Sequence, residues 1–338
     1  MRCGLSVKST PGDIALSKFL TPSRKSAEPG LIERRDVKTS LIKRLAFDII
    51  RIRVLNLLLR SVLKPIAPFI PDRIVNRMPV VGTVHLCLPD SNVLVLVSDG
   101  RDSLASRLYW SGLRAFEPET IDVYMRLLKH CRVVFDVGAN TGVFALLAAN
   151  YASDMDVHAF EPVPRIFDCL VKNARANSLS NLKPVCSAVT NYDGEARLYI
   201  PRSITLPFSA STQEGFREAQ ERIVVPALKL DTYVITNNIA KVDLLKIDTE
   251  GTEHEVLEGA EQILKKDKPL IICEVLCGLT ESLLHSILDG AGYRFFLMTG
   301  EGLICQERII GDPAYENRNY LFITEDKIAG HLQGIRIN

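Results

Sequence analysis

Residues 133–146 read Val-Val-Phe-Asp-Val-Gly-Ala-Asn-Thr-Gly-Val-Phe-Ala-Leu. A short apolar run rich in β-branched residues is followed by three small turn residues, Gly138, Asn140 and Gly142, and then by an apolar helical pattern. Glycine lets the chain bend tightly and lets a ligand approach the backbone. The helix that follows offers free N–H groups to an anion. The stretch therefore predicts a strand, a cofactor-binding loop and a helix.

The spacing of this loop indicates which cofactor it binds. A dinucleotide loop follows the pattern G-x-G-x-x-G, but Asn140 stands in place of the middle glycine and no third glycine follows at the required distance. Asp136 at the end of the strand suits a ligand with a cationic amino group. S-adenosylmethionine has such a group and a dinucleotide does not, so we expect S-adenosylmethionine.

A second acidic residue supports a nucleotide-like ligand. Glu161 ends the next apolar run, Met155-Asp-Val-His-Ala-Phe, and Pro162 follows it. A carboxylate at this point of a βαβ unit, about 20 residues beyond the loop, accepts hydrogen bonds from ribose hydroxyls. The cofactor site that we expect consists of Asp136, Gly138, Ala139, Asn140, Thr141, Gly142, Glu161 and Pro162.

With these residues, the chain resembles the FkbM family of S-adenosylmethionine-dependent methyltransferases. The similarity spans roughly residues 80–324, and its most specific segment is Val242-Asp-Leu-Leu-Lys-Ile-Asp-Thr-Glu-Gly-Thr-Glu253. Further matching segments are Phe135–Gly142, Ala159–Pro162, Leu230–Thr232, Val256–Ala260 and Ile271–Val275. The resemblance implies O-methylation of a hydroxyl, for which we expect a sugar of a glycan, glycolipid or glycosylated product.

The order of strand and helix patterns predicts an α/β fold. We expect a Rossmann-like class I methyltransferase with a doubly wound, mostly parallel sheet, an N-terminal hairpin and a basic helical extension. The hairpin is expected at 83–88 and 93–97, and a helix at 121–129. Strands are expected at 133–137, 155–161, 182–187, 195–200, 242–248, 269–275, 293–298 and 320–324.

Several candidates for the chemistry lie at the carboxyl ends of the predicted fourth and fifth strands, where ligands collect in such sheets. They are Lys246, Asp248, Glu250, His254 and Glu274. Lys246 and Asp248 share one side of their strand, as a structural ion pair or as a pair that tunes a base. The base could be any of the acids or His254. Alternatively, Asp248, Glu250 and Glu274 could hold a magnesium ion that binds a diol.

Residues 203–220 interrupt the sheet pattern and could form a lid or an acceptor-binding loop. Ser209, Ser211 and Thr212 could donate hydrogen bonds to a polyhydroxylated acceptor, or could belong to an ordinary polar turn.

Charge is distributed unevenly along the chain of 338 residues, whose net charge is only +1. Residues 1–70 hold 14 Lys and Arg against 5 Asp and Glu. We expect a disordered basic arm at 1–40, a basic apolar helical extension at 41–78, the methyltransferase domain at 79–326 and a tail at 327–338. Eight scattered cysteines and the lack of a signal-peptide pattern favour reduced thiols and a cytoplasmic protein.

The segment 41–66 reads as a helix with apolar residues all around it and therefore with weak amphipathicity. It could pack on the domain or on a second subunit of a homo-oligomer, the reading that we favour, or could contact a membrane peripherally.

The partner that we expect is a small-molecule or glycan acceptor, and not a nucleic acid. Two other functions stay open. One is a nicotinamide-dependent oxidoreductase, which the glycine spacing disfavours. The other is a non-catalytic protein that binds an adenosyl ligand and docks through its basic arm.

Overall fold

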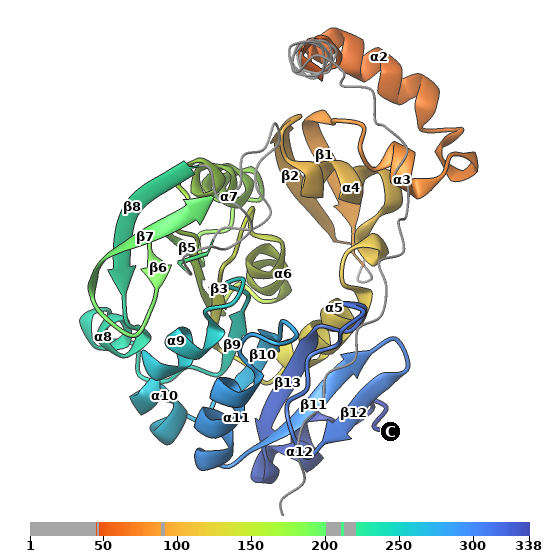
Figure 1. Cartoon of the computed structure of the whole chain (residues 1–338). Coiled ribbons are helices and arrows are strands. Elements are labelled where there is room, and N and C mark those ends of the chain that lie inside the picture. Colours follow the sequence, from red (N-terminus) through yellow and green to blue (C-terminus); the bar gives the residue numbers. More distant parts are fainter. Residues whose placement is uncertain (1–44, 46, 89–91, 201–210, 213–220) are drawn as a thin grey trace, which may run out of the picture. The chain divides into compact units, whose positions relative to one another are not determined.

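A central eight-stranded sheet organises the molecule (Figure 1). The computed structural model describes residues 45, 47–88, 92–200, 211–212 and 221–338. The described residues from 47 onward belong to one compact unit. The strand order is β12-β11-β13-β10-β9-β3-β4-β5. Five strands are parallel, β3 (Val133–Val137), β4 (Asp156–Phe160), β5 (Leu182–Val185), β9 (Leu244–Ile247) and β10 (Leu270–Glu274). Three antiparallel strands complete the sheet: β11 (Tyr293–Thr299), β12 (Gly302–Gln306) and β13 (Asn319–Thr324).

This arrangement confirms the doubly wound, mostly parallel sheet. The parallel strands are covered on both faces, which is why they read as continuous apolar runs. Period-two alternation divides them between two cores, so that Val134 joins one apolar cluster and Phe135 the other.

Helices cover both faces of the sheet (Figure 1). One cluster includes apolar residues of α5 (Pro118–Leu128), α6 (Val143–Tyr151) and α7 (Pro164–Ala176). The other includes apolar residues of α8 (Leu230–Thr236), α9 (Glu253–Glu258), α10 (Glu261–Lys266) and α11 (Glu281–Gly290). The helix α6 is buried along almost its whole length, from Val143 to Ala149, and is therefore apolar on every side.

The expected hairpin is a two-stranded sheet of β1 (Val81–Cys87) and β2 (Val93–Asp99), followed by α4 (Ser103–Ser111). Its turn at 89–91 lies outside the described residues. Two asparagines, Asn173 in α7 and Asn177 directly after it, bind the edge of β2. The Oδ1 atom of Asn173 accepts from Val97 N at 2.7 Å, and that of Asn177 accepts from Val95 N at 2.8 Å. The Nδ2 atom of Asn173 also donates to Thr141 O at 2.8 Å, which connects the hairpin to the glycine loop.

A third sheet is formed by the residues between β5 and α8. It consists of β6 (Ala188–Val189), β7 (Gly194–Ile200) and β8 (Glu221–Leu228) in the order β6-β8-β7. The strand expected at 195–200 therefore belongs to a separate small sheet, and β8 and β12 were not anticipated. Most of 203–220 lies outside the described residues, including Ser209. Ser211 pairs with Tyr199 of β7.

The N-terminal helix differs from the expectation in two ways. The helix α2 spans only Arg53–Leu63, because the helical segment before it is interrupted at Arg51 and Ile52. Its apolar residues are also not spread around it. They gather on an exposed face with Val54, Leu58 and Val62, opposite buried Asn56, so the expectation of weak amphipathicity was wrong. Short helices connect α2 to β1, namely η1 (Ala67–Phe69) and α3 (Asp72–Val75), and η2 (Leu113–Ala115) precedes α5.

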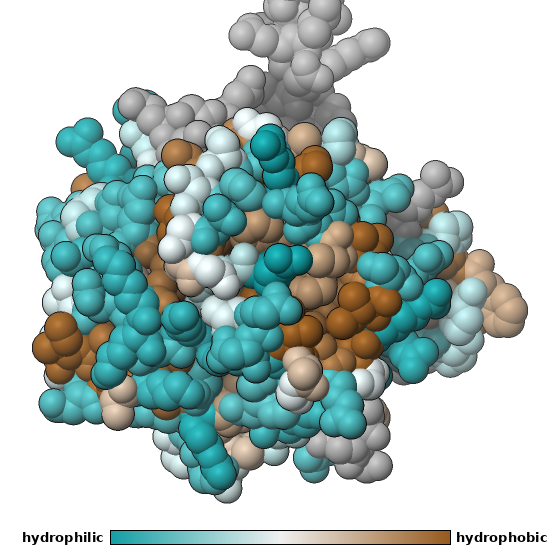
Figure 2. All heavy atoms as spheres, turned by 90° about the horizontal axis from the view of Figure 1, so that it is seen from below, coloured by the Kyte–Doolittle hydropathy of each residue, from teal (hydrophilic) through white to brown (hydrophobic). Residues whose placement is uncertain are grey.

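The end of the chain is bound to the sheet. The helix α12 (Glu325–His331) follows β13, and the residues after it pair with β12, where Leu303 N donates to Arg336 O at 2.8 Å and Asn338 N donates to Leu303 O at 2.8 Å. The face seen from below is mainly hydrophilic and is interrupted by small apolar groups (Figure 2). Among the described residues, every helix is too short or too polar to span a bilayer. The seven described cysteines are free thiols.

Candidate active site

The loop between β3 and α6 has a backbone that its sequence explains. Gly138, Asn140 and Gly142 have φ angles of 77°, 52° and 96°, in the left-handed region that glycine and asparagine tolerate best. A Cβ atom on Gly138 would lie 1.8 Å from the carbonyl oxygen of Asp248, and one on Gly142 would lie 2.3 Å from Cδ1 of Leu170. These glycines thus allow close packing of the loop against the end of β9 and against α7.

Glu161 fixes the position of this loop. Its Oε2 accepts from Asn140 N at 3.0 Å and its Oε1 accepts from Val163 N at 2.8 Å. Burial raises the pKa of Glu161 to about 7, although these two backbone donors oppose the shift. Since a carboxylate offers about four lone-pair sites, further sites stay available for ligand hydroxyls.

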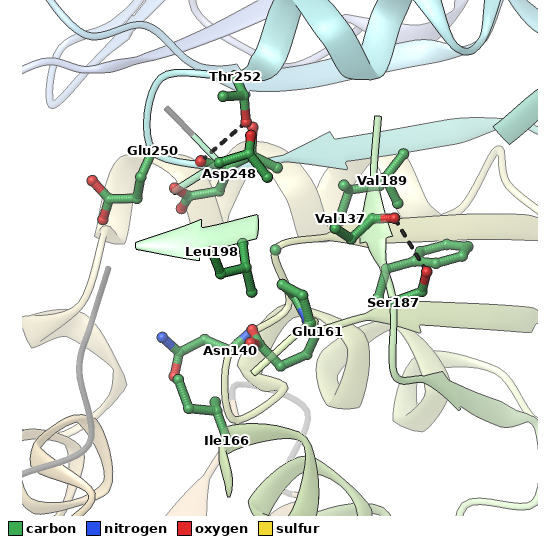
Figure 3. A pocket seen from close by; sticks show the side chains of 16 residues that line it. Val137, Asn140, Glu161, Ile166, Ser187, Val189, Leu198, Asp248, Glu250 and Thr252 are labelled. Carbon is green, nitrogen blue, oxygen red and sulfur yellow. Dashed lines mark hydrogen bonds between the residues drawn. The ribbon is translucent and has the colours of Figure 1, made fainter. Parts of the chain in front are cut away.

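A cleft lies beside this loop at the carboxyl edge of the sheet. Figure 3 shows Asp248 and Glu250 at one end of the cleft and Asn140 and Glu161 on its opposite side. The small sheet contributes Leu198 to the wall. Gly138, Pro162, Ile166, Ser187, Val189, Thr212 and Thr252 also line it. The cleft is narrow, with a volume of about 50 Å³, well below the roughly 300–1,000 Å³ of usual small-ligand pockets.

Other expected cofactor residues do not line the cleft. The carboxylate of Asp136 is buried and accepts from Ala145 N at 2.9 Å, at the start of α6. Burial raises the pKa of Asp136 to about 7. Ala139 donates its N–H to Phe160 O at 2.9 Å, and Thr141 and Gly142 complete the turn into the helix. Contact of these residues with the cofactor therefore stays a prediction.

Lys246 is a charged side chain inside the sheet layer. It is only 1% exposed, its Nζ lies 3.1 Å from Oδ2 of Asp248, and it lies 4.9 Å from the ring centre of Phe144. Burial alone would lower the pKa of Lys246, but Asp248, Glu117 and Asp136 outweigh that effect and raise it. Lys246 therefore stays protonated at neutral pH. Its ion pair holds Asp248 in place.

Glu253 shapes the loop after β9. This fully buried side chain uses Oε1 to accept from Thr249 N at 3.0 Å and from Gly251 N at 2.9 Å. Glu250 lies between them with a φ of 57°, a conformation that is costly for a residue other than glycine. This strained turn brings Glu250 to the cleft.

Glu274 at the end of β10 completes an acidic group with Asp248 and Glu250. One carboxylate oxygen from each of the three lies within 4.8 Å of the others. The Oε1 atom of Glu274 accepts from Nη1 of Arg318 at 2.7 Å, while its Oε2 is buried without a hydrogen-bond partner among the described residues. Burial, Asp248 and Glu250 raise the pKa of Glu274, and Arg318 opposes them. The group has the oxygen chemistry of a magnesium site, but Lys246 and Arg318 already bind two of its three carboxylates.

The remaining expected residue, His254, does not line the cleft. It lies in the first turn of α9, and its Nδ1 is buried without a hydrogen-bond partner among the described residues. Two other residues were missed in the sequence, Glu117 and Arg318, and Glu253 was noted only as part of the motif. The Glu-Pro pair at 117–118 signals a helix start, and nothing in the sequence near Arg318 links it to Glu274.

Comparison with known proteins finds a family-level similarity. The Methyltransferase FkbM domain model matches residues 136–295, which include the glycine loop, Glu161 and the acidic group. This part of the chain is similar to an FkbM methyltransferase domain.

Curated relatives show the same similarity. The chain is 32% identical over 155 residues to 31-O-demethyl-FK506 methyltransferase FkbM of Streptomyces tacrolimicus, covering 38% of this chain and 59% of the relative. It is 25% identical over 175 residues to the hexuronic acid methyltransferase AglP of Haloferax volcanii, covering 52% of this chain and 69% of the relative. The matches to the first two relatives thus span about three fifths of their length.

Solved structures give a weaker likeness. The methyltransferase FkbM of Methylobacillus flagellatus shares 14% identity at a TM-score of 0.40, with 57% of this chain and 43% of that chain covered. A SAM-dependent methyltransferase of Agrobacterium tumefaciens shares 10% identity at a TM-score of 0.39, with 72% and 70% covered.

Proposed function

We propose that this protein is an S-adenosylmethionine-dependent O-methyltransferase that acts on a hydroxyl of a sugar in a glycan, a glycolipid or a glycosylated product. The observation that carries the proposal is the glycine loop held by Glu161 at the edge of the cleft. Asn140 and Gly138 would contact the methionine part of the cofactor, and Glu161 would accept from the ribose hydroxyls. Because the cleft is narrow, cofactor binding would have to widen it. Leu198 of the small sheet and Thr212 line the side of the cleft that would have to move.

The choice of acceptor is supported by the names of two relatives. One relative is named a 31-O-demethyl-FK506 methyltransferase and another a hexuronic acid methyltransferase. Both names describe methylation of oxygen-rich small molecules or sugars, which agrees with a cleft that ends in carboxylates and hydroxyls.

The chemistry that we propose is a direct displacement. The acceptor oxygen forms a bond to the methyl carbon while the bond from that carbon to sulfur breaks, which leaves S-adenosylhomocysteine and a proton from the hydroxyl. The enzyme must align the acceptor and remove that proton. Asp248 is our first candidate for the base, since Lys246 holds one of its oxygens and leaves the other available. Glu250 lies beside it on the same turn.

Calorimetry tests the cofactor assignment. We expect the purified protein to bind S-adenosylmethionine and S-adenosylhomocysteine and not NAD. Binding of NAD alone would favour an oxidoreductase and contradict the proposal.

An acceptor screen with isotope-labelled S-adenosylmethionine and mass spectrometry then tests catalysis. Transfer of label to a hydroxyl is the expected result. Tight binding of S-adenosylhomocysteine with no transfer to any glycan, glycolipid or glycoside would favour a non-catalytic adenosyl-binding protein.

We also propose that the exposed face of α2 contacts an anionic lipid surface. Val54, Leu58 and Val62 are 69%, 60% and 67% exposed, and Phe69 beyond the helix is 88% exposed. Exposed Arg53 stands on the same helix, and the preceding sequence is rich in cations. Apolar side chains flanked by basic ones are typical of segments that lie in a membrane interface.

A further inference from the structure

A second cavity lies on the other side of the acidic group. It is lined by Arg107 of α4, by the start of α5 with Glu117 and Glu119, and by Tyr315, Arg318 and Asn319 in and beside the loop before β13. Its volume of about 220 Å³ is slightly below the range of roughly 300–1,000 Å³ for drug-sized ligands. The space therefore suits one sugar ring.

Arg318 connects this cavity to the cofactor cleft. Its guanidinium lines the cavity and donates to Glu274 at 2.7 Å. A Glu274 oxygen lies within 4.8 Å of oxygens of Asp248 and Glu250, which line the cleft. The two spaces are thus separated by the side chains that the proposed chemistry uses.

Two residues of the wall have a strained backbone. Glu117 has a φ of 42° and Tyr315 a φ of 56°, in the region where non-glycine residues are uncommon. The loop that carries Tyr315 is held by Asp312, which accepts from the N–H groups of Ala314, Glu316 and Asn317 at 2.9, 3.0 and 3.0 Å. Such strain is retained where a position is functionally constrained, and here it presents a 52% exposed aromatic ring to the cavity.

One residue of the cavity wall also has an unsatisfied acceptor. Asn319 is 5% exposed, and its Nδ2 donates to Oε2 of Glu117 at 3.0 Å and to Oγ1 of Thr120 at 2.9 Å. Its Oδ1 is buried and has no hydrogen-bond partner among the described residues. A buried acceptor without a donor is unfavourable, and a ligand hydroxyl would supply that donor.

We propose that this cavity is the acceptor subsite and that it binds a neutral sugar ring. This inference rests on the proposed function and specifies the acceptor of the same site. Carboxylates and guanidinium groups bind vicinal hydroxyls, and the ring of Tyr315 packs against the apolar face of a pyranose. The lining holds three carboxylates, of Glu117, Glu119 and Glu316, against two guanidinium groups. It therefore disfavours an acidic sugar.

Saturation-transfer NMR with methyl glycosides tests the subsite without requiring turnover. The probes are methyl β-D-glucopyranoside, methyl α-D-mannopyranoside and methyl β-D-glucuronide, with the full chain saturated by S-adenosylhomocysteine. We expect at least one neutral glycoside to bind more tightly than the glucuronide. Tyr315→Ala should weaken that binding about tenfold, while Tyr315→Phe should retain it.

A matched control and an independent measurement keep the test decisive. Tyr151 is 40% exposed at the end of α6, so Tyr151→Ala removes a comparable ring elsewhere and should leave glycoside binding unchanged. Calorimetry should show the same affinity of S-adenosylhomocysteine in all variants. Preference for the glucuronide, unchanged binding in Tyr315→Ala, or no glycoside binding at all would overturn the subsite. If the wild-type protein does not bind S-adenosylhomocysteine, the proposed function is wrong instead. Glycoside binding can still be measured in the absence of S-adenosylhomocysteine.

Discussion

Two regions depart from the usual distribution, in which charged side chains are exposed and apolar ones are buried. The acidic end of the sheet buries charged side chains, whereas the helix α2 exposes apolar ones. At the sheet, Lys246 and Glu274 are buried charges. On α2, Val54 and Leu58 are exposed, while buried Asn56 faces the protein. The two regions differ in how far contacts within the protein offset the unfavourable free energy of this arrangement.

The buried charges are compensated within the protein. Lys246 is bound to Asp248 and Glu274 to Arg318, and Glu253 accepts from two backbone N–H groups. Buried charges persist only when they are paired and hydrogen-bonded in this way.

On α2 only the polar side of the helix has hydrogen-bond partners within the protein. Asn56 donates to Pro79 O at 2.7 Å and accepts from Val81 N at 2.9 Å, and Nη1 of Arg60 donates to Val81 O at 2.7 Å. The described residues leave the apolar side uncovered. The comparison therefore predicts that changes at the sheet disturb folding and catalysis, whereas changes on α2 disturb only association.

The largest effect is expected for Lys246→Met. Removing one partner of a buried ion pair typically costs about 3–5 kcal/mol in the free energy of unfolding, because Asp248, Asp136 and Glu117 would lose their shared cation. The loss should grow from pH 5.5 to pH 8. Without the cation, the pKa values of Asp136 and Glu117, which burial already raises, rise further in the folded state. The folded state then takes up more protons than the unfolded state and loses stability as pH rises. Urea denaturation at both pH values measures it.

Lys241→Met is the matched control. Lys241 also pairs with an acid two residues later, Asp243, at 2.7 Å, but its side chain is 58% exposed against 2% for Lys246. We expect a loss below about 1 kcal/mol. Equal losses in both variants would show that burial of the Lys246 pair has no special role.

The second effect concerns turnover. Asp248→Asn should lower kcat by about 10²–10⁴-fold, the range for loss of a general base, and leave S-adenosylhomocysteine affinity nearly unchanged. Asp289→Asn, an exposed substitution on α11, should have no effect in the same assay. Normal turnover of Asp248→Asn at saturating substrate would reduce Asp248 to the structural partner of Lys246. Loss of activity in chelator that magnesium restores would instead assign the acidic group to a metal ion.

The third effect concerns the cofactor. Glu161→Ala should weaken S-adenosylhomocysteine binding by about 1–3 kcal/mol, the range for a hydrogen bond to a charged group, as measured by calorimetry. Glu195→Ala, at an exposed position of β7, is the control and should bind normally. An unchanged affinity in Glu161→Ala would remove this carboxylate from the cofactor site and limit its role to holding Asn140.

The sequence was informative where the signal is local. Alternation of strand and helix patterns predicted the parallel sheet, and the glycines predicted the loop, because these features depend on neighbouring residues. That Glu161 holds this loop through Asn140 N was not anticipated. The strand β12 was missed, since it is a short edge strand directly after a turn.

Contacts between distant segments could not be predicted in this way. Arg318 meets Glu274 across 44 residues, and Asn319 meets Glu117 across 202. The orientation of α2 depends on hydrogen bonds of Asn56 and Arg60 to the backbone around β1. A helical pattern by itself would have placed the apolar side inward.

The smallest effect on folding is expected on α2, and it tests the other half of the comparison. The triple variant Val54→Ser, Leu58→Ser and Val62→Ser alters only exposed positions, so the free energy of unfolding should change by no more than about 0.5 kcal/mol per site. Binding to vesicles of anionic phospholipid, measured by sedimentation, should be lost because the apolar contact with the lipid is removed. Ile235→Ser on α8, where the side chain is 75% exposed, should bind vesicles like the wild type.

If the wild type does not bind vesicles but forms a dimer that the triple variant cannot form, the apolar face of α2 belongs to an interface with a second copy of this chain. If it does neither, the exposed apolar face of α2 needs no partner, and the inference from its inverted side chains is wrong.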